Sequence, residues 1–300
     1  MKRYAPMLAT RMPRPFTDRS WMFEPKWDGI RLLVESDGSK MTLRTRSGRT
    51  MDHAAFRETP AGHPVVLDGE LVAFDELGVP RFGLLQRGAA SIAYMVFDIL
   101  YDETEVIDEP LEDRLDRLAR LALPPPFIRS EAIPTEGEAL FSAAASSGLE
   151  GIVAKRLGSR YRPGARSPDW LKITVKHTVR AVVGGFTRGE GSRSSTFGAL
   201  LVGVPSEAGL RWAGAVGTGF DEASLAAIRD ALEQMRSERC PFEDDEELPR
   251  GATWVVPSLV AAVEYKEWTT AGRLRAPSFK GFTDEPADRW ENEGPTTPAS

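Results

Sequence analysis

The sequence is nearly devoid of the residues that make disulfides and zinc sites. Its 300 residues include one cysteine, Cys240, which excludes an internal disulfide and any zinc site built from cysteines. The three histidines, His53, His63 and His177, show no metal-ligand spacing. These absences favour the cytoplasm over an oxidising compartment.

Long apolar segments are also lacking. No run reaches the roughly 18 residues that a membrane span needs. The first six residues, Met-Lys-Arg-Tyr-Ala-Pro, lack the apolar core of a secretion signal. A hydrophobic fraction of 41% and a charged fraction of 27% are typical of a globular protein, and 300 residues suffice for two domains of ordinary size.

Positive charge is in the minority, but it is concentrated. The 38 basic and 44 acidic residues give a net charge of −6, which alone argues against a nucleic-acid partner. Residues 155–193, however, hold ten basic residues and two acids, a local net charge of 10 − 2 = +8. Such a stretch is either a solvated surface or a footprint for phosphates, and the motifs described below favour the phosphates.

The hydrophobic pattern predicts two different halves. Short strand-like runs separated by turns that contain glycine predict an antiparallel sheet in the first 100 residues, and leucines at helical spacing predict a helix at residues 111–121. Beyond residue 180, several short strands surround a single helix at residues 222–235, which is typical of a small, partly open barrel of the oligonucleotide-binding (OB) kind. Strands are expected at residues 31–35, 41–45, 65–74, 92–100, 151–154, 170–175, 181–186, 199–204, 210–216 and 259–265, and a further helix at residues 136–146.

Lys26 is the strongest candidate for chemistry in the chain. It stands in the segment EPKWDGIR, residues 24–31, where Gly29 permits close backbone approach and Asp28 and Arg31 lie nearby. An amine attacks phosphorus only after losing its proton, so such a lysine needs an enclosed, electropositive or metal-occupied pocket. A short motif of this kind, taken alone, is more often an exposed lysine in a turn.

Lys26 has companions that appear downstream in a fixed order. Each places a charged or aromatic residue beside a glycine or within an apolar strand. They are Arg46 in TRSG, Glu70 in DGE, Phe97 in FD, Glu150 and Lys155 in EGIVAK, and Lys172 in WLK.

In this order the motifs resemble those of ATP-dependent DNA ligases, and in particular the bacterial ligases of nonhomologous end joining. The resemblance covers about residues 5–282. It implies an α+β fold, with a nucleotidyltransferase (adenylation) domain of antiparallel sheets flanked by helices at residues 1–177. A C-terminal OB-fold β-barrel would follow at residues 178–290, and then a disordered tail at residues 291–300.

The resemblance implies a role for each residue of the nucleotide site. Lys26 would be the nucleophile that takes AMP from ATP, assisted by the cations Lys155 and Lys172. Phe97 would stack on adenine. Glu70 and Glu150 would bind Mg²⁺ or Mn²⁺, which prefer oxygen ligands. The remaining nucleotide contacts are expected from Glu24, Arg31, Arg46, Glu70 and Lys176.

Two departures from the family pattern concern cations. Thr174 stands where the family commonly has a second lysine, and Lys176 could replace it if it shares a strand face with Lys172. The last motif keeps only Arg275 and Lys280 for the handling of pyrophosphate. DNA contacts are expected from Arg46, Arg162, Arg166, Arg188 and Arg193.

The resulting prediction is a monomeric DNA ligase that seals nicked duplex DNA on the nucleoid, in DNA repair or end joining. Because Lys26 comes early, no DNA-wrapping domain is expected before it, and an end-binding repair protein is expected as a partner. Three alternatives remain: an RNA ligase, an mRNA capping guanylyltransferase, and a catalytically silent nucleic-acid-binding protein.

Overall fold

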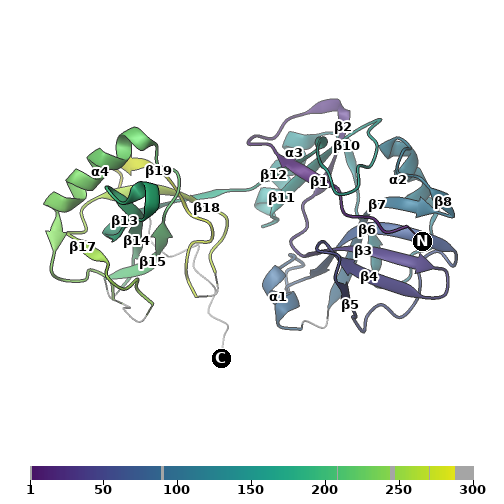
Figure 1. The fold of residues 1–300 in the computed structure, drawn as a ribbon, viewed down its shortest axis with the longest axis horizontal. Helices are drawn as coiled ribbons and strands as arrows, with labels where there is room; N and C mark the ends of the chain where they lie inside the picture. Colours follow the sequence, from purple (N-terminus) through teal and green to yellow (C-terminus); the bar gives the residue numbers. More distant parts are fainter. Residues whose placement is uncertain (1, 89–90, 208, 244–246, 270, 288–300) are drawn as a thin grey trace. The chain divides into compact units, whose positions relative to one another are not determined.

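The computed structural model describes residues 2–88, 91–207, 209–243, 247–269 and 271–287. The chain divides into two compact units, Met1–Val175 and Lys176–Ser300 (Figure 1). We expected the division after residue 177, and the structure has it two residues earlier. The tail predicted to be disordered, residues 291–300, lies outside the described residues.

The first unit contains two sheets. In the first sheet, all neighbouring strands are antiparallel except β1 and β12, which are parallel. Its order is β1 (Leu8–Arg11), β12 (Arg166–Thr174), β11 (Gly151–Arg156), β2 (Asp18–Pro25) and β10 (Ile133–Thr135). The second sheet has the order β5 (Thr50–Met51), β4 (Met41–Thr45), β3 (Ile30–Asp37), β6 (Pro64–Ala73), β7 (Ile92–Asp102) and β8 (Thr104–Glu105), with β9 (Phe127–Arg129) parallel to β7.

The second sheet is buried on both faces. Leu32 and Val34 point to one face, where they belong to the same core cluster as Leu118 of α2 (Leu111–Arg120). Leu33, between them, points to the opposite face and joins Trp170 of β12 in the core between the two sheets. Alternate residues of a strand face opposite sides, so one apolar strand supplies both cores.

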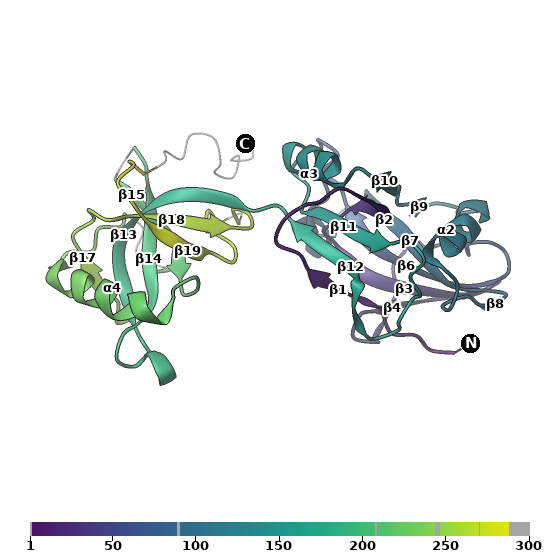
Figure 2. The same ribbon diagram turned by 90° about the horizontal axis from the view of Figure 1, so that it is seen from above.

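Three helices accompany these sheets. Figure 2 shows α3 (Gly137–Ser146) beside β2 and β11 of the first sheet, where Ala144 packs with Ile152 and Phe23. Helix α2 contacts β7. A short helix, α1 (Phe82–Gln86), follows β6 and has no buried residue. The predicted α+β architecture, with antiparallel sheets flanked by helices, is confirmed.

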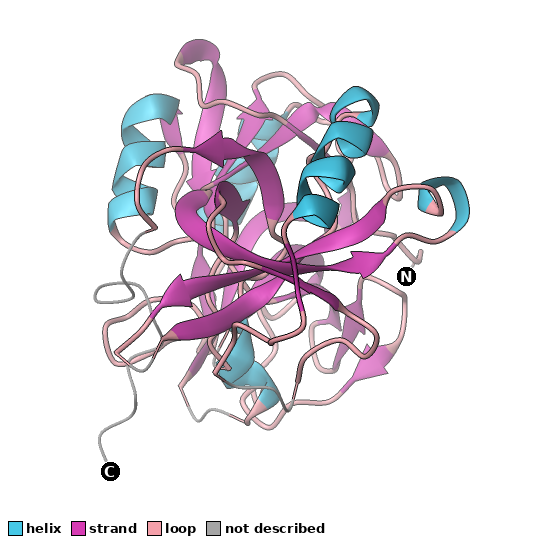
Figure 3. Ribbon diagram, turned by 90° about the vertical axis from the view of Figure 1, so that its left-hand side faces the viewer, coloured by secondary structure: helices cyan, strands magenta, loops and turns pink. Residues whose placement is uncertain are grey.

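The second unit is built mainly of strands (Figure 3). The long strand β13 (His177–Arg188) pairs with three neighbours and organises the OB-like region, and Val183, Phe197 and Leu232 lie in its core. The order is β15 (Leu210–Val216), β14 (Phe197–Pro205), β13, β17 (Thr253–Val255) and β16 (Arg236–Ser237), while β18 (Val260–Tyr265) pairs with β13 and β19 (Ser278–Thr283) pairs with β18. The 3₁₀ turn η1 (Gly191–Arg193) and helix α4 (Glu222–Gln234) complete the unit.

A small, partly open barrel of the oligonucleotide-binding kind was expected for the second unit, and an OB-like region without a closed barrel is confirmed. Within the described residues, β15, β16 and β19 each pair with one neighbouring strand only, so the paired strands do not form a closed ring. Strand β13 bends and is shared among β14, β17 and β18, with register shifts near Gly185 and Arg188. Such irregularities twist a strand and allow it to serve two sheet directions without closure.

No helix in the described part of the chain is long and apolar enough to cross a membrane.

Candidate active site

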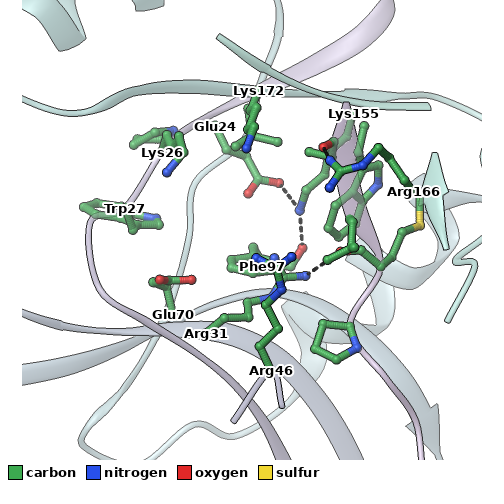
Figure 4. A pocket seen from close by; sticks show the side chains of 17 residues that line it. Glu24, Lys26, Trp27, Arg31, Arg46, Glu70, Phe97, Lys155, Arg166 and Lys172 are labelled. Atoms are coloured by element: carbon green, nitrogen blue, oxygen red, sulfur yellow. Dashed lines mark hydrogen bonds and ion pairs between the residues drawn. The ribbon is translucent and has the colours of Figure 1, made fainter. Parts of the chain in front are cut away.

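A cavity of about 250 Å³ opens in the first unit, among residues of both sheets (Figure 4). The segment at residues 6–9, which leads into β1, forms one wall. Most of the predicted nucleotide-site residues, from six strands and two loops, line this cavity. They are Glu24, Lys26, Arg31, Arg46, Glu70, Phe97, Lys155 and Lys172, together with Arg166, which we had assigned to DNA.

Lys26 follows the last residue of β2 and is held by the neighbouring strand β11. Its backbone N–H donates to the Gly151 carbonyl at 2.8 Å, and its Nζ lies 2.5 Å from Glu150 Oε2. Both side chains are largely shielded, with 22% and 12% of their surfaces exposed. The pairing of β2 with β11 therefore brings a carboxylate against the candidate nucleophile.

Gly151 makes this arrangement possible. Its φ is +141°, a conformation that side chains disfavour, and a Cβ there would lie 2.1 Å from the Ile173 carbonyl oxygen of β12. A glycine at this point lets β11 begin directly beside β12. The preceding residue, Glu150, is thereby fixed next to Lys26.

Lys155 lies beneath the cavity and is almost completely buried. Its Nζ is 2.7 Å from Glu24 Oε1 and donates to the Phe97 carbonyl at 2.7 Å. The ammonium also lies 4.6 Å from the centre of the Phe97 ring and 4.5 Å from that of Trp170, within range of a cation–π interaction. Burial raises the pKa of Glu24, and Lys155 opposes that shift. Lys155 thus fixes the Phe97 backbone and compensates a buried carboxyl group.

Arg31 is held in place by a buried carboxylate. Its Nε and Nη2 donate to the two oxygens of Asp68, each at 2.6 Å, and its guanidinium lies 4.5 Å from the centre of the Phe97 ring. Asp68 also accepts a hydrogen bond from the Tyr161 hydroxyl at 2.6 Å, and that hydroxyl accepts one from the Met7 N–H at 2.9 Å. One tyrosine therefore joins the cavity wall at residues 6–9 to the support of Arg31.

Positive charge without a carboxylate partner collects among the described residues of the cavity. Within the described residues, neither Arg46 nor Lys172 has a hydrogen-bond or ion-pair partner, and Arg166 donates only to the Ala9 carbonyl. The pKa of Lys172 is lowered, first by burial and then by the nearby charges of Lys26, Arg166 and Arg46. Cations that repel one another at a cavity wall suit an anion with several charges, such as a polyphosphate.

The other predicted residues lie outside this cavity. Strand β12 ends at Thr174, so the expectation that Lys176 continues the face of Lys172 is wrong. Lys176 belongs to the second unit, where Glu264 binds both it and Lys280. Arg162 lies 3.9 Å from Asp169, Arg275 pairs with Glu267, and Arg188 and Arg193 line a cavity of the second unit.

Comparison with known proteins gives the family. Residues 6–174 match the family model described as "ATP dependent DNA ligase domain", and residues 193–285 match "ATP dependent DNA ligase C terminal region". The chain belongs to the ATP-dependent DNA ligase family.

Two curated relatives and one solved structure show the extent of the similarity. The "Multifunctional non-homologous end joining DNA repair protein LigD" of Mycobacterium tuberculosis is 43% identical over 291 residues, which cover 93% of this chain and 38% of the relative. The LigD of Pseudomonas aeruginosa is 35% identical, over 98% of this chain and 37% of the relative. The chain thus spans less than two fifths of the length of these relatives. The structure of "mycobacterial DNA ligase D complexed with ATP and MES" is 36% identical with a TM-score of 0.55, over 95% of this chain and 96% of that one.

Three residues of the cavity and its support received no role from the sequence. Asp68 opens the DGE motif but only Glu70 was assigned, Met7 has no motif, and Tyr161 lies in a loop rich in glycine, proline and arginine. A usable signal for Asp68 was its place in an apolar strand, because a buried carboxylate needs a cationic partner. For Tyr161 the sequence offers no comparable signal.

Replacing Tyr161 by phenylalanine should weaken the use of ATP. The substitution removes one hydrogen bond to the Asp68 carboxylate and leaves the Met7 N–H without its acceptor. A hydrogen bond to a charged group is worth about 1.5–3 kcal/mol, so the KM for ATP in AMP transfer should rise roughly tenfold, with a smaller change in kcat. Tyr101→Phe is the matched control, because the Tyr101 hydroxyl has no hydrogen bond within the described residues. An unchanged KM in Y161F would show that the Tyr161 hydroxyl does not help to hold Asp68, Arg31 and the cavity wall in place.

Glu70 makes the stability of the nucleotide-free ligase depend on pH. Burial raises its pKa from 4.5 to about 7, although Arg31 and Lys26 oppose the shift. The folded protein therefore retains a proton that the unfolded chain has already released, and the wild type loses stability as pH rises from about 4.5 to 7.

The variant Glu70→Gln should lack this loss. At pH 5 we expect the two proteins to be similar. At pH 8 the free energy of unfolding of the variant should exceed that of the wild type by on the order of 2–3 kcal/mol. Thermal unfolding without nucleotide or metal measures the difference, and Glu58→Gln, at an exposed position, is the control. Parallel stability curves for wild type and E70Q would show that the Glu70 pKa is not raised.

Proposed function

We propose that this protein seals nicks between a 5′-phosphate and a 3′-hydroxyl in duplex DNA, using AMP held covalently on Lys26. The proposal is carried by one observation: Lys26 meets Glu150 at 2.5 Å beside a cavity that is also lined by Arg46 and Lys172, which have no hydrogen-bond or ion-pair partner among the described residues. The related DNA ligase D complexed with ATP supports ATP as the nucleotide.

In the proposed first step, Lys26 Nζ attacks the α-phosphorus of ATP. A phosphorus–nitrogen bond forms while the bond to pyrophosphate breaks, and pyrophosphate leaves with the electron pair. Glu150 is placed to accept the proton that the amine must lose, because it is already hydrogen-bonded to Nζ. Lys172, Arg46 and Arg166 stabilise the negative charge that develops on the phosphate oxygens.

The Phe97 ring is proposed to carry the adenine. It is 8% exposed, lines the cavity and is supported from below by Arg31 and Lys155. The Lys155–Glu24 pair fixes the backbone of Phe97 beneath the base. Lys155 therefore acts by positioning Phe97, since its ammonium is already engaged by Glu24 and the Phe97 carbonyl.

A divalent ion, Mg²⁺ or Mn²⁺, is proposed to bind with the nucleotide. Glu70 and Glu150 are the candidate ligands, and the described residues contain no group of three or more metal-ligating side chains. This donor set fits a hard ion that uses one or two carboxylates and completes its shell with phosphate oxygens and water. When bound, the ion would supply charge neutralisation at the phosphates.

In the second and third steps, AMP passes to the 5′-phosphate of the nick and the 3′-hydroxyl then displaces it. Arg46, Arg162, Arg166, Arg188 and Arg193 are proposed to contact the DNA, and Arg275 and Lys280 to assist the pyrophosphate, once released from Glu267 and Glu264. The relatives are named for end joining, which supports a role in DNA repair on the nucleoid, with an end-binding protein as partner.

The test has two stages. Incubation with ATP and Mg²⁺ should add the mass of one AMP to the intact protein. A nicked duplex made entirely of DNA should then be sealed efficiently, and a duplex with RNA at the nick should be sealed poorly. Preferential labelling by GTP would favour a capping enzyme, preferential sealing of RNA an RNA ligase, and the absence of any adduct a silent binding protein.

A further inference from the structure

The second unit contains a cavity of its own, of about 460 Å³, where β13 ends. Two arginines that are distant in the sequence meet there. Strand β17 runs antiparallel to β13, with Phe186 opposite Thr253. Following β13 forward and β17 backward from that pair brings Arg188 and Arg250 to the same sheet edge, where both line the cavity.

The cavity carries unneutralised positive charge. Arg188 and Arg250 are exposed, and within the described residues neither side chain has a hydrogen-bond or ion-pair partner. A third arginine, Arg193, is immobilised, because its Nη1 donates to the carbonyls of Gly217 at 2.8 Å and Gly198 at 3.3 Å. With Glu190 as the one acid of the lining, the net charge is 3 − 1 = +2.

The remaining lining offers polar atoms and no platform for a base. The Thr187 hydroxyl accepts from the Ala199 N–H at 3.0 Å, which leaves its own hydrogen available to an oxygen in the cavity. Gly198 leaves the Thr187 hydroxyl accessible, since a Cβ at position 198 would lie 2.7 Å from the hydroxyl oxygen. Among the described residues, no aromatic side chain lines the cavity, so the site suits an anion rather than a stacked ring.

We propose that this cavity binds a phosphate of the DNA backbone, gripped by Arg188 and Arg250 and faced by the fixed charge of Arg193. This inference rests on the ligase function proposed above and adds Arg250, which lies far outside the basic stretch at residues 155–193. Guanidinium forks match phosphate oxygens, and contacts of this kind hold a duplex without reading its sequence.

Salt dependence gives a direct test. In the full chain, Arg188→Gln and Arg250→Gln should each weaken binding to a nicked duplex severalfold, to a similar degree for unrelated sequences. Each should also reduce the slope of log K against log salt by about 1, and the double variant by about 2. Arg239→Gln is the control, since Arg239 is an exposed arginine of the same unit outside this cavity. Unchanged affinity and slope in both variants would overturn the proposal.

Two further measurements separate this inference from the proposed function. AMP transfer from ATP to the protein without DNA should be unchanged in R188Q and R250Q, because both residues lie outside the Lys26 cavity. Discharge of the AMP adduct by inorganic pyrophosphate should likewise be unchanged. If pyrophosphate discharge fell while nick binding stayed constant, the anion would be pyrophosphate and the DNA assignment would be wrong. A wild type that forms no adduct would instead contradict the proposed function.

Discussion

Replacing Lys26 by alanine should abolish the AMP adduct, with the rate of its formation falling at least about a thousandfold. The reason is chemical, because no other amine of the described chain is placed in the cavity as Lys26 is. Lys155 is buried against Glu24 and the Phe97 carbonyl, and Lys172 has no hydrogen-bonded carboxylate among the described residues to take its proton, as Glu150 can for Lys26. Intact-mass measurement after incubation with ATP and Mg²⁺ checks this directly.

Two controls show that the loss comes from the nucleophile and not from misfolding. Lys40→Ala, in an exposed turn, should form the adduct at the wild-type rate. Lys26→Arg keeps the positive charge beside Glu150 but should be as inactive as the alanine variant, since a guanidinium stays protonated and does not attack phosphorus.

A DNA nick that already carries AMP on its 5′-phosphate supplies the matching positive control. Sealing of that nick makes no new bond to Lys26, so both variants should retain much of this activity. An AMP adduct that persists in K26A would place the nucleophile at another residue and refute the mechanism.

Most of the longer strands and helices could be predicted, because apolar runs and helical spacing are local features of the sequence. The apolar runs in residues 31–35 and 65–74 mark β3 and β6, which bury apolar side chains on both faces. The leucines of α2 meet β7 because they recur on one face of a helix. Short strands such as β1 and β17 were missed, since two to four residues carry too little periodicity.

The motifs identified most of the residues that line the cavity, but not which of their side chains are buried or form ion pairs. Lys155 was expected to assist at the α-phosphate; it lines the cavity, and its buried ion pair with Glu24, 131 positions earlier in the sequence, was not foreseen. Lys176 was expected on the Lys172 strand and instead pairs with Glu264 across β13 and β18. Both outcomes depend on long-range strand pairing, which no local pattern specifies.

The open second unit shows the same limit on a larger scale. Its short strands and single helix were predicted from short apolar runs and turn residues, but the order in which the strands pair around β13 was not. The register shifts of β13 near Gly185 and Arg188 have no apolar signature in the sequence. The pairing of β13 with β17, which no local pattern predicts, also brings Arg250 to Arg188 at the edge of the cavity in the second unit.

Removing the buried carboxylate of Asp98 should strongly destabilise the first unit. Asp98 follows Phe97 on β7 and receives two hydrogen bonds from Arg114 of α2, at 2.8 and 2.9 Å, and neither side chain is exposed. The variant Asp98→Asn would leave a buried guanidinium without its counter-charge. Breaking such a pair from one side costs about 3–5 kcal/mol.

Hydrogen exchange resolved by peptide measures this cost locally. The free energy of opening should fall by that amount for β7 and α2, while β13 and β14 of the second unit serve as an internal reference. Arg117→Met is the matched control in the same helix. Arg117 pairs with Glu109 while 36% exposed, and such surface pairs contribute at most about 1 kcal/mol.

The double variant Asp98→Leu/Arg114→Met distinguishes the cost of an unpaired buried charge from the cost of the lost hydrogen bonds. If the cost in D98N comes from the uncompensated guanidinium, removing both charges should restore most of the stability. Arg114 Nη1 also donates to the carbonyls of Glu109 and Ser159, so those two acceptors would lose a partner and recovery would be incomplete. Because the Phe97 carbonyl beside Asp98 holds Lys155, the rescued protein should also regain the AMP adduct. A D98N variant as stable as R117M would show that the pair does not support the cavity.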